Sequence, residues 1–344
     1  FLYFIGMLVM PTRAESVFSH IAGPALVTPF WMEGLRTFVS QVDAGVFHVT
    51  AAALPVTATV TIAEARELYA PVAFALWARA CDRLRGVEQR LIVGISGPAG
   101  AGKSVFVAVL RRFLIDALAH VPPEAAQSLG VRGTTSGRDD AVAVLGIDGY
   151  HRRNAELEVA GSRTEKGRPH TFDATALRAD LASLCRSHTV EALLPAYDRN
   201  VHEPVAGAVR VPAGCPLVLV EGILIFTDAF GLMAGGRAEA GPTVDDARPG
   251  DVFDVTVWLA MPEELAKKRV NERKLRGGRS HELVETHYAR VDGPNLRDML
   301  AAAGRASHVF EYVAAVRSED DADGAEINEK HGEWRFESVQ QRRT

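Results

Sequence analysis

The sequence predicts a three-layer α/β/α fold, in which helices cover both faces of a mainly parallel central sheet. From about residue 90 onward, short apolar segments alternate with longer amphipathic segments. Strands that alternate with helices form βαβ units, whose strands run parallel. The short segments are apolar almost throughout, as expected for strands that are covered on both faces. These two observations together predict the fold class.

Composition narrows the range of functions. The 344 residues carry a net charge of −5 at pH 7, which argues against a nucleic-acid-binding surface as the main function. Three cysteines (Cys81, Cys185 and Cys215) lie far apart, which favours a reducing compartment over a disulfide framework or a zinc site. No segment is long and apolar enough for a membrane helix. We therefore expect a cytoplasmic protein that binds neither nucleic acid nor membrane.

The chain divides into four parts. Residues 1–60 show weak periodicity and have no assigned role. Residues 61–90 read as a helical lead-in, with a Thr61 cap, Glu64 in the first turn and a break or kink at Pro71. Residues 91–316 hold the alternating pattern, and residues 317–344 read as a polar, acidic, solvated tail.

The elements of the alternating region follow in order. Strands are expected at "RLIVGIS", "AVAVLGIDGYH", "CPLVLVEGILIF", "VFDVTVWLA" and "ASHVFEYVAAV". Helices are expected at "KSVFVAVLRRFLIDALAH", at "DATALRADLASLCRS" and at the basic segment "PEELAKKRVNERKLRGG". The Pro-, Gly-, Ser- and Thr-rich segment at 121–140 reads as a loop.

A glycine-rich segment joins the first strand to the first helix of this region. Its letters, "GPAGAGKS", fit the pattern G-x-x-x-x-G-K-[ST] at every fixed position. Backbone N–H groups of such a loop surround phosphate oxygens, and the helix directs its N-terminus at the same charge. The sequence therefore predicts binding of ATP and Mg²⁺, with Lys103 on the β- and γ-phosphates and Ser104 on the metal. The predicted nucleotide-binding residues are Gly97, Pro98, Ala99, Gly100, Ala101, Gly102, Lys103, Ser104 and Val105.

Two carboxylates follow apolar strands of the same region. Asp148 ends "VLGID", and Glu221 ends "LVLVE". At the carboxyl ends of parallel strands they would lie in the crevice where α/β proteins bind ligands. Asp148 could then accept the proton of an attacking hydroxyl, and both carboxylates could hold Mg²⁺. Taken alone, Asp148 is as well explained by a D-G turn, and Glu221 by a strand-end charge in solvent.

Longer motifs carry a resemblance to a known family. "DGYHRRNAELEVAGSRTEKGRPHTFD", "PAYDRNVHEP" and "VEGILIF" resemble the uridine kinase and phosphoribulokinase superfamily of P-loop kinases, and most of all its pantothenate kinase-like branch. The resemblance covers about residues 91–310 and implies transfer of the ATP γ-phosphoryl to a hydroxyl of a small metabolite. It implies that Asp148 activates the hydroxyl and that Glu221 lies near the metal. It also implies acceptor contacts, for which the candidates are Tyr150, His151, Lys166, Tyr197, Arg199, His202 and Asn295.

The basic helix is similar to the arginine-bearing lid of these kinases, here about 262–280. Arg269 and Arg273 are the candidates to close over the phosphates, because a guanidinium neutralises several oxygens at once. A solvated basic helix face is the alternative interpretation. With Lys103 and Asp148, these two arginines complete the predicted catalytic set.

The acceptor is left open. "YDRNVHEPVAG" departs from the "YSH" of pantothenate kinases and from the "YDF" of uridine kinases, so a pantothenate-like, nucleoside or sugar-like acceptor remains possible. The alternative function is a nucleotide-dependent regulatory or chaperone protein without a small-molecule acceptor. The sequence lacks the "NKxD" motif with which many regulatory NTPases bind guanine, so this motif gives the alternative no support. Because relatives often dimerise, a homodimer is a further expectation.

Overall fold

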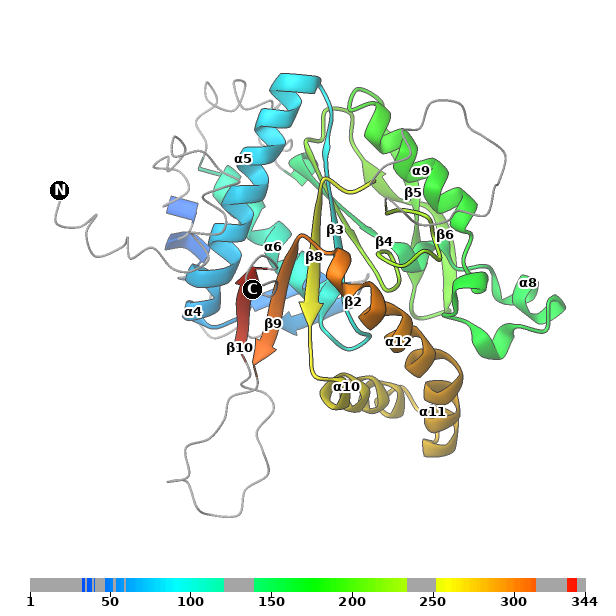
Figure 1. Ribbon diagram of the computed structural model, residues 1–344. Coiled ribbons are helices and arrows are strands. Elements are labelled where there is room, and N and C mark those ends of the chain that lie inside the picture. The colour runs from blue at the N-terminus through cyan, green and yellow to red at the C-terminus, as the bar shows by residue number, and fades with distance from the viewer. Residues whose placement is uncertain are drawn as a thin grey trace, which may run out of the picture.

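A six-stranded sheet forms the centre of the protein (Figure 1). The structure is a computed structural model that describes residues 33–34, 36–38, 40, 47–51, 54–58, 60–120, 139–233, 252–313 and 333–338. The strand order is β10-β9-β8-β3-β7-β4, and all neighbours run parallel except the antiparallel pair β10 and β9. These strands are β3 (Leu91–Ser96), β4 (Val142–Gly146), β7 (Leu217–Glu221), β8 (Val255–Ala260), β9 (His308–Val313) and β10 (Glu333–Ser338).

Side chains of the central strands are buried on both faces of the sheet. In β3, Leu91, Val93 and Ile95 belong to one hydrophobic core, whereas Ile92 belongs to the other. Because successive side chains of a strand point to opposite faces, one apolar run supplies both cores. This arrangement explains why the strand segments are apolar throughout.

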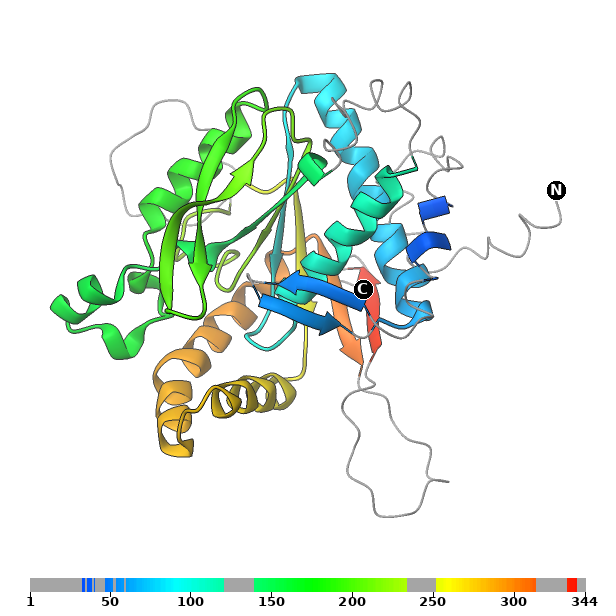
Figure 2. The ribbon, with the colours of Figure 1, turned by 180° about the vertical axis from the view of Figure 1, so that it is seen from behind.

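Helices cover each face. The first core lies under α5 (Ala70–Val87) and α6 (Lys103–Leu118), and the second lies mainly under α9 (Ala174–Arg186) and α12 (Gly293–Ala302). The short helix α4 (Ile62–Glu64) leads into α5. Figure 2 shows α5 and α6 on the side of the sheet opposite to α9. The predicted three-layer fold with a mainly parallel sheet is confirmed.

Further helical elements lie near the carboxyl ends of the strands (Figure 1). They are α8 (Asn154–Val159), α10 (Glu263–Arg276) and α11 (His281–His287), with a π-helical turn at Tyr288–Asp292 before α12. A separate antiparallel hairpin of β5 (Ala192–Asp198) and β6 (Glu203–Val211) lies beside the edge strand β4. A second hairpin, of β1 (Phe47–Ala51) and β2 (Leu54–Ala58), lies against α6 (Figure 2).

The helical lead-in is one continuous helical segment. Thr61 and Glu64 form a reciprocal capping box, in which the Thr61 hydroxyl accepts from the Glu64 N–H at 3.0 Å. A π-helical turn at Ala65–Tyr69 precedes Pro71, which occupies the first turn of α5. The wider turn accommodates the missing proline N–H, so of the expected break or kink at Pro71 the break is absent and the helix continues.

Part of the expected tail belongs to the sheet. Residues 333–338 form β10, which pairs with β9 from Glu333 opposite Val313 to Ser338 opposite His308. The expectation of a solvated tail is therefore wrong for these six residues, and the rest of 317–344 lies outside the described residues. The alternation of Trp334 and Phe336 with polar neighbours is a strand pattern that the acidic composition concealed.

Candidate active site

The glycine-rich loop connects β3 to α6 as predicted. Gly100 and Gly102 have φ angles of 87° and 82°, in the left-handed region that favours glycine. Helix α6 begins directly at Lys103, so its N-terminus faces the loop. The Lys103 ammonium is buried and donates to the carbonyl oxygens of Gly97 and Pro98 at 2.8 and 2.9 Å. Its burial lowers its pKa to about 8, although Glu221 and Asp148 favour the charged form.

The two carboxylates meet at one edge of the sheet. Glu221 ends β7 and is buried, and its Oε1 accepts from the Ser104 hydroxyl at 2.9 Å. Burial, followed by the charge of Asp148, raises the pKa of Glu221. Asp148 follows the adjacent parallel strand β4, so both groups lie at neighbouring carboxyl ends. Tertiary structure thus excludes the interpretation of Glu221 as a charge in solvent.

Glycine follows each carboxylate because the backbone needs the space. A Cβ on Gly149 would lie 2.4 Å from the Pro195 carbonyl oxygen, and one on Gly222 would lie 2.2 Å from Cγ1 of Ile147. Such distances are below any van der Waals contact. The "DG" and "EG" pairs therefore permit the hairpin and the strand ends to lie close to the site.

An arginine of the hairpin holds Asp148. The Arg199 guanidinium donates to Oδ2 of Asp148 at 2.9 Å. Burial opposes ionisation of Asp148, but His151, Arg199, Lys103 and Arg273 together lower its pKa below the ordinary value. Asp148 is therefore a charged carboxylate with one oxygen engaged by Arg199.

Three aromatic side chains lie beside Asp148. The His151 ring lies 3.9 Å from the ring of Phe172 and 5.2 Å from that of Tyr197, measured between centroids. Nδ1 of His151 lies 2.9 Å from the Asp148 carbonyl oxygen. Burial lowers the pKa of His151, although the charge of Asp148 opposes this. Burial together with the charge of Asp148 raises the pKa of Tyr197 to about 12.

Lys166 lies on the same side of the site. Its ammonium donates to Oδ1 of Asn154 at 2.7 Å and to the carbonyl oxygen of His202 at 2.8 Å, and lies 5.2 Å from the centre of the Tyr197 ring. His202 has a φ of 56°, and its backbone rather than its ring makes this contact. The structure therefore brings Lys166, Tyr197, Arg199 and the backbone of His202 together on the side of the site where Asp148 lies.

Two predicted acceptor contacts have structural partners instead. Tyr150 is buried, and its hydroxyl donates to Oδ2 of Asp180 in α9 at 2.9 Å. Asn295 is buried in α12, where its Nδ2 donates to the Gly167 carbonyl oxygen at 2.9 Å and its Oδ1 accepts from Arg168 at 2.7 Å. Asn295 thus holds the loop that carries Lys166.

The predicted lid helix, α10, packs on the glycine-rich loop. A Cβ on Gly100 would lie 2.9 Å from the Ala266 carbonyl oxygen and 3.3 Å from Cβ of Arg269. Partial desolvation and Arg199 lower the pKa of Arg273, while the charge of Asp148 opposes this. Most charged side chains of α10 are exposed, that of Arg273 among them, so the solvated-face interpretation stays open for this helix.

These groups suit a nucleotide and its metal. The Ser104 hydroxyl and the carboxylates of Glu221 and Asp148 are hard oxygen donors, and Mg²⁺ is bound by one or two carboxylates together with substrate phosphates. Lys103, Arg273 and Arg199 supply positive charge beside them. The residues present therefore fit Mg²⁺ and a triphosphate.

A cavity of about 720 Å³ opens from this site. It is lined by Ser104, Glu221, Asp148, Tyr197 and Arg199 at one end. From there it runs between α6, the edge strand β4 and the β5–β6 hairpin. Arg269, Arg273 and Lys103 are not among its lining residues.

Kinases are found among similar proteins. The chain is 27% identical over 226 residues to the protein YggC of Escherichia coli, which is named as uncharacterized, covering 66% of this chain and 79% of that one. It is 28% identical over 213 residues to a pantothenate kinase of Nocardioides sp., covering 57% and 55%. It is 21% identical over 229 residues to "Putative uridine kinase C227.14" of Schizosaccharomyces pombe, covering 65% and 81%. No family model matches.

The chain is a relative of the pantothenate and uridine kinases. The motifs predict the superfamily that these kinases share, and the comparisons confirm it. The chain spans about half the length of the pantothenate kinase it matches. The solved structure of YFH7 from Saccharomyces cerevisiae shares its fold, with a TM-score of 0.50, 14% identity and coverage of 68% of this chain and 95% of that one. None of the described helices is long and apolar enough to cross a membrane.

Sequence reasoning missed three supporting residues of this kinase relative. Asn154 binds Lys166, and the Asn154 N–H donates to Oε1 of Glu203 at 2.9 Å, which joins α8 to the hairpin. Arg168 donates to Asn295 and to Asp298. Asn154 and Arg168 stand within the quoted motif, but nothing in the sequence shows that they bond to residues distant in the chain.

Proposed function

We propose that the protein is an ATP-dependent, Mg²⁺-requiring kinase that transfers the γ-phosphoryl group to a hydroxyl of a small metabolite. One observation carries the proposal: Lys103, Ser104, Glu221 and Asp148 converge at the carboxyl edge of the sheet, next to a cavity. Phosphoryl transfer needs positioning and charge neutralisation more than covalent chemistry. This arrangement supplies both, together with a carboxylate directed toward the acceptor side.

Each residue has a proposed part. Loop N–H groups and Lys103 bind the β- and γ-phosphates, and Ser104 and Glu221 hold Mg²⁺, which neutralises phosphate charge when bound. Asp148 orients the acceptor hydroxyl and takes its proton as the new P–O bond forms. Arg273 and Arg199 stabilise negative charge on the transferring group, and Arg269 closes with the lid helix.

The acceptor pocket is proposed from the remaining contacts. His151, Tyr197 and Lys166 form the wall beside Asp148, and His202 contributes its carbonyl oxygen. The acceptor is pantothenate-like, nucleoside-like or sugar-like, as the names of the relatives and the sequence motifs suggest. Three widely spaced cysteines, of which Cys81 and Cys215 are buried, support a cytoplasmic location. Dimerisation stays a prediction.

The test is ADP release by the purified protein with Mg²⁺ and ATP. The acceptors are pantothenate, uridine, cytidine, ribulose 5-phosphate, fructose and glycerate, with a blank that has no acceptor. At least one acceptor should raise the rate well above the blank. The Asp148→Asn variant should retain ATP affinity and lose at least about 100-fold in kcat, the usual contribution of a general base.

A matched control is Asp228→Asn, because Asp228 is an exposed carboxylate paired with Arg305 away from the cavity. It should keep the wild-type rate. Equal ADP release with every acceptor and with none would overturn the kinase proposal and favour the regulatory or chaperone NTPase. An unchanged kcat in Asp148→Asn would remove Asp148 from the role of base.

A further inference from the structure

The cavity continues well past the residues that would hold the reacting hydroxyl. Its far end is lined by Arg111 of α6, by Asp139 and Asp140, which precede β4, and by Arg210 of β6. Asp148 lies at the opposite end, after β4. A single cavity thus joins the candidate catalytic carboxylates to a second group of charged side chains.

The lengths of two strands, β4 and β5, give the same distance between the two polar ends of the cavity. Strand β4 runs four steps from Val142 to Gly146, and β5 runs four steps from Leu193, which pairs with Arg210, to Tyr197 beside Asp148. At about 3.3 Å per residue, each span is roughly 13 Å. Because side chains reach back into the cavity, the two polar ends lie on the order of 10 Å apart.

Small side chains keep the passage between them open. The lining residues from both walls in this stretch include Ala108, Ala143, Ala196 and Ala208. Valines at 142, 144 and 209 supply the rest of the apolar lining. A compact acceptor bound at Asp148 would leave this passage and its polar end unused.

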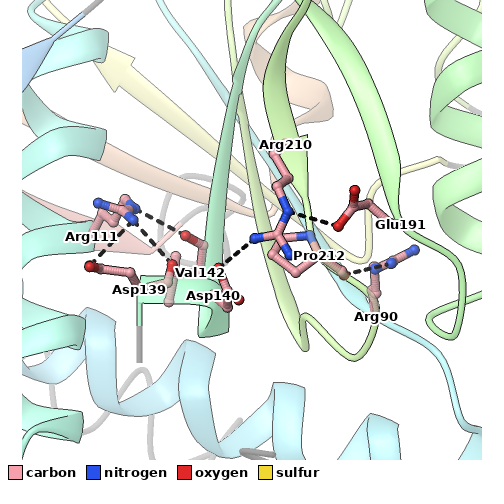
Figure 3. A network of polar contacts seen from close by, with 8 residues as sticks. All are labelled: Arg90, Arg111, Asp139, Asp140, Val142, Glu191, Arg210 and Pro212. Carbon is pink, nitrogen blue, oxygen red and sulfur yellow. Dashed lines mark hydrogen bonds and ion pairs between the residues drawn. The ribbon is translucent and has the colours of Figure 1, made fainter. Parts of the chain in front are cut away.

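The far end is held in place by its own contacts (Figure 3). Arg210 donates from Nε to Glu191 at 2.7 Å and from Nη1 to Asp140 at 2.9 Å. Arg111 donates to the carbonyl oxygens of Val142 at 3.0 Å and Asp139 at 3.1 Å. Within the described part of the chain, Nη2 of Arg210 and Nη1 of Arg111 have no hydrogen-bond partner, so each partly exposed guanidinium retains donors for a ligand.

Charge decides which group these donors suit. Arg111, Arg112 and Arg210 line this end with three positive charges. Four carboxylates oppose them: Asp139 and Asp140 in the lining, Glu191 paired with Arg210, and Asp116 paired with Arg112. A full oxyanion would therefore meet guanidiniums whose charge is already neutralised. A neutral group that accepts from a guanidinium N–H and donates to a carboxylate oxygen is complementary to the cluster, and an amide edge does both.

We propose that this cluster is a distal subsite of the acceptor pocket, which binds a neutral amide-type edge about 10 Å from the reacting hydroxyl. The shared chemistry is a C=O next to an N–H, found in the edge of a nucleobase such as uracil and in an aliphatic amide. The inference rests on the proposed function. It selects extended, neutral-ended acceptors over compact sugars, glycerate and acceptors with a distal carboxylate.

The test compares four acceptors in the ADP-release assay. Uridine and pantothenamide both present an amide edge, one from a base and one from an aliphatic chain. Pantothenate differs from pantothenamide only in its distal carboxylate, and glycerate has no distal group. Uridine or pantothenamide should exceed both pantothenate and glycerate in kcat/KM by about tenfold. A preference for uridine would identify the bound amide edge as that of a nucleobase, and a preference for pantothenamide would identify it as that of an aliphatic amide.

Two variants tie the preference to the cluster. Arg210→Gln should raise KM for the preferred amide acceptor by about tenfold and leave kcat within about twofold, because the lost contact is made equally in ground and transition states. Asp140→Asn should lower the ratio of kcat/KM for pantothenamide to that for pantothenate, because it removes one negative charge that repels the pantothenate carboxylate. Arg305→Gln, an arginine in a similar exposed pair outside the cavity, is the control and should leave all ratios unchanged.

The outcomes separate this inference from the proposed function. If glycerate or fructose is used as well as the amide acceptors, or if pantothenate is preferred to pantothenamide, the distal subsite is refuted and the kinase stands. Unchanged KM in Arg210→Gln with a normal unfolding midpoint also refutes it. If no acceptor raises ADP release above the blank, the proposed function fails, and the inference fails with it.

Discussion

Arg90 offers a quantitative test of how the hairpin is joined to the sheet. Its side chain is 1% exposed, although it lies at the start of the central strand β3. The guanidinium donates to four backbone carbonyl oxygens, those of Ser187, His188, Val190 and Pro212. Figure 3 shows it next to Pro212, at the end of β6. One side chain therefore links β3, the end of α9 and the hairpin.

The cost of removing this group follows from its contacts. Each hydrogen bond contributes about 1 kcal/mol net, and an abandoned buried acceptor costs about 1–3 kcal/mol. Water can reach some of the four carbonyls after truncation, so we expect Arg90→Ala to lose about 4 kcal/mol of unfolding free energy. For a protein of 344 residues that is roughly a 6 °C lower Tm. The change is large beside a typical total stability of about 5–15 kcal/mol.

The measurement is urea-induced unfolding, followed by circular dichroism, of the wild type, Arg90→Ala and Arg90→Lys. The lysine variant should recover only part of the loss, because an ammonium cannot span four acceptors as the planar guanidinium does. Arg210→Gln, which removes an exposed arginine from the same hairpin, is the control and should change stability by less than about 1 kcal/mol. A loss below about 1 kcal/mol in Arg90→Ala would refute the reasoning.

Two further predictions concern stability and thiol chemistry. Thr61→Ala removes the capping box with Glu64 and should cost about 1 kcal/mol of unfolding free energy, whereas Thr61→Ser should retain it; equal unfolding curves for all three proteins would contradict the capping role. Burial raises the pKa of Cys185 and of Cys215 to about 11, so both thiols should be neutral at pH 8 and react with iodoacetamide far more slowly in the native protein than in urea. The unfolded thiols ionise near pH 9 and the folded ones near pH 11, so their contribution to the free energy of unfolding should be present below pH 9 and decline between pH 9 and 11. Rapid labelling of Cys215 in the native protein would contradict the burial of this thiol.

Local patterns predict much of this fold. The strands at Leu91–Ser96 and Leu217–Glu221 and the helix at Lys103–Leu118 fall where apolar runs and periodicity place them. The strands were predictable because a strand buried on both faces is a continuous run of apolar residues. The helix was predictable because a helix packed on a sheet has apolar residues along one face. Strand β10 was missed, because its pairing with β9 depends on a partner that precedes it by more than twenty residues.

The candidate site was predictable where residues act next to one another in the chain. The glycine-rich loop specifies its own geometry, since its glycines adopt backbone angles that other residues avoid. The roles of Tyr150 and Asn295 were not predictable in this way. Each is drawn to a partner remote in sequence, Asp180 for one and Gly167 with Arg168 for the other.

The sequence by itself determined the chemistry that is present: a phosphate-binding loop, carboxylates after apolar strands, and a basic helix. Tertiary structure alone decided which of these groups meet. The parallel pairing of β4 with β7 brings Asp148 near Glu221, and the hairpin places Arg199 on Asp148 and Arg210 at the far end of the cavity. Strand order and hairpin placement follow from packing between segments that are distant in the sequence, and no local pattern in the chain records those contacts.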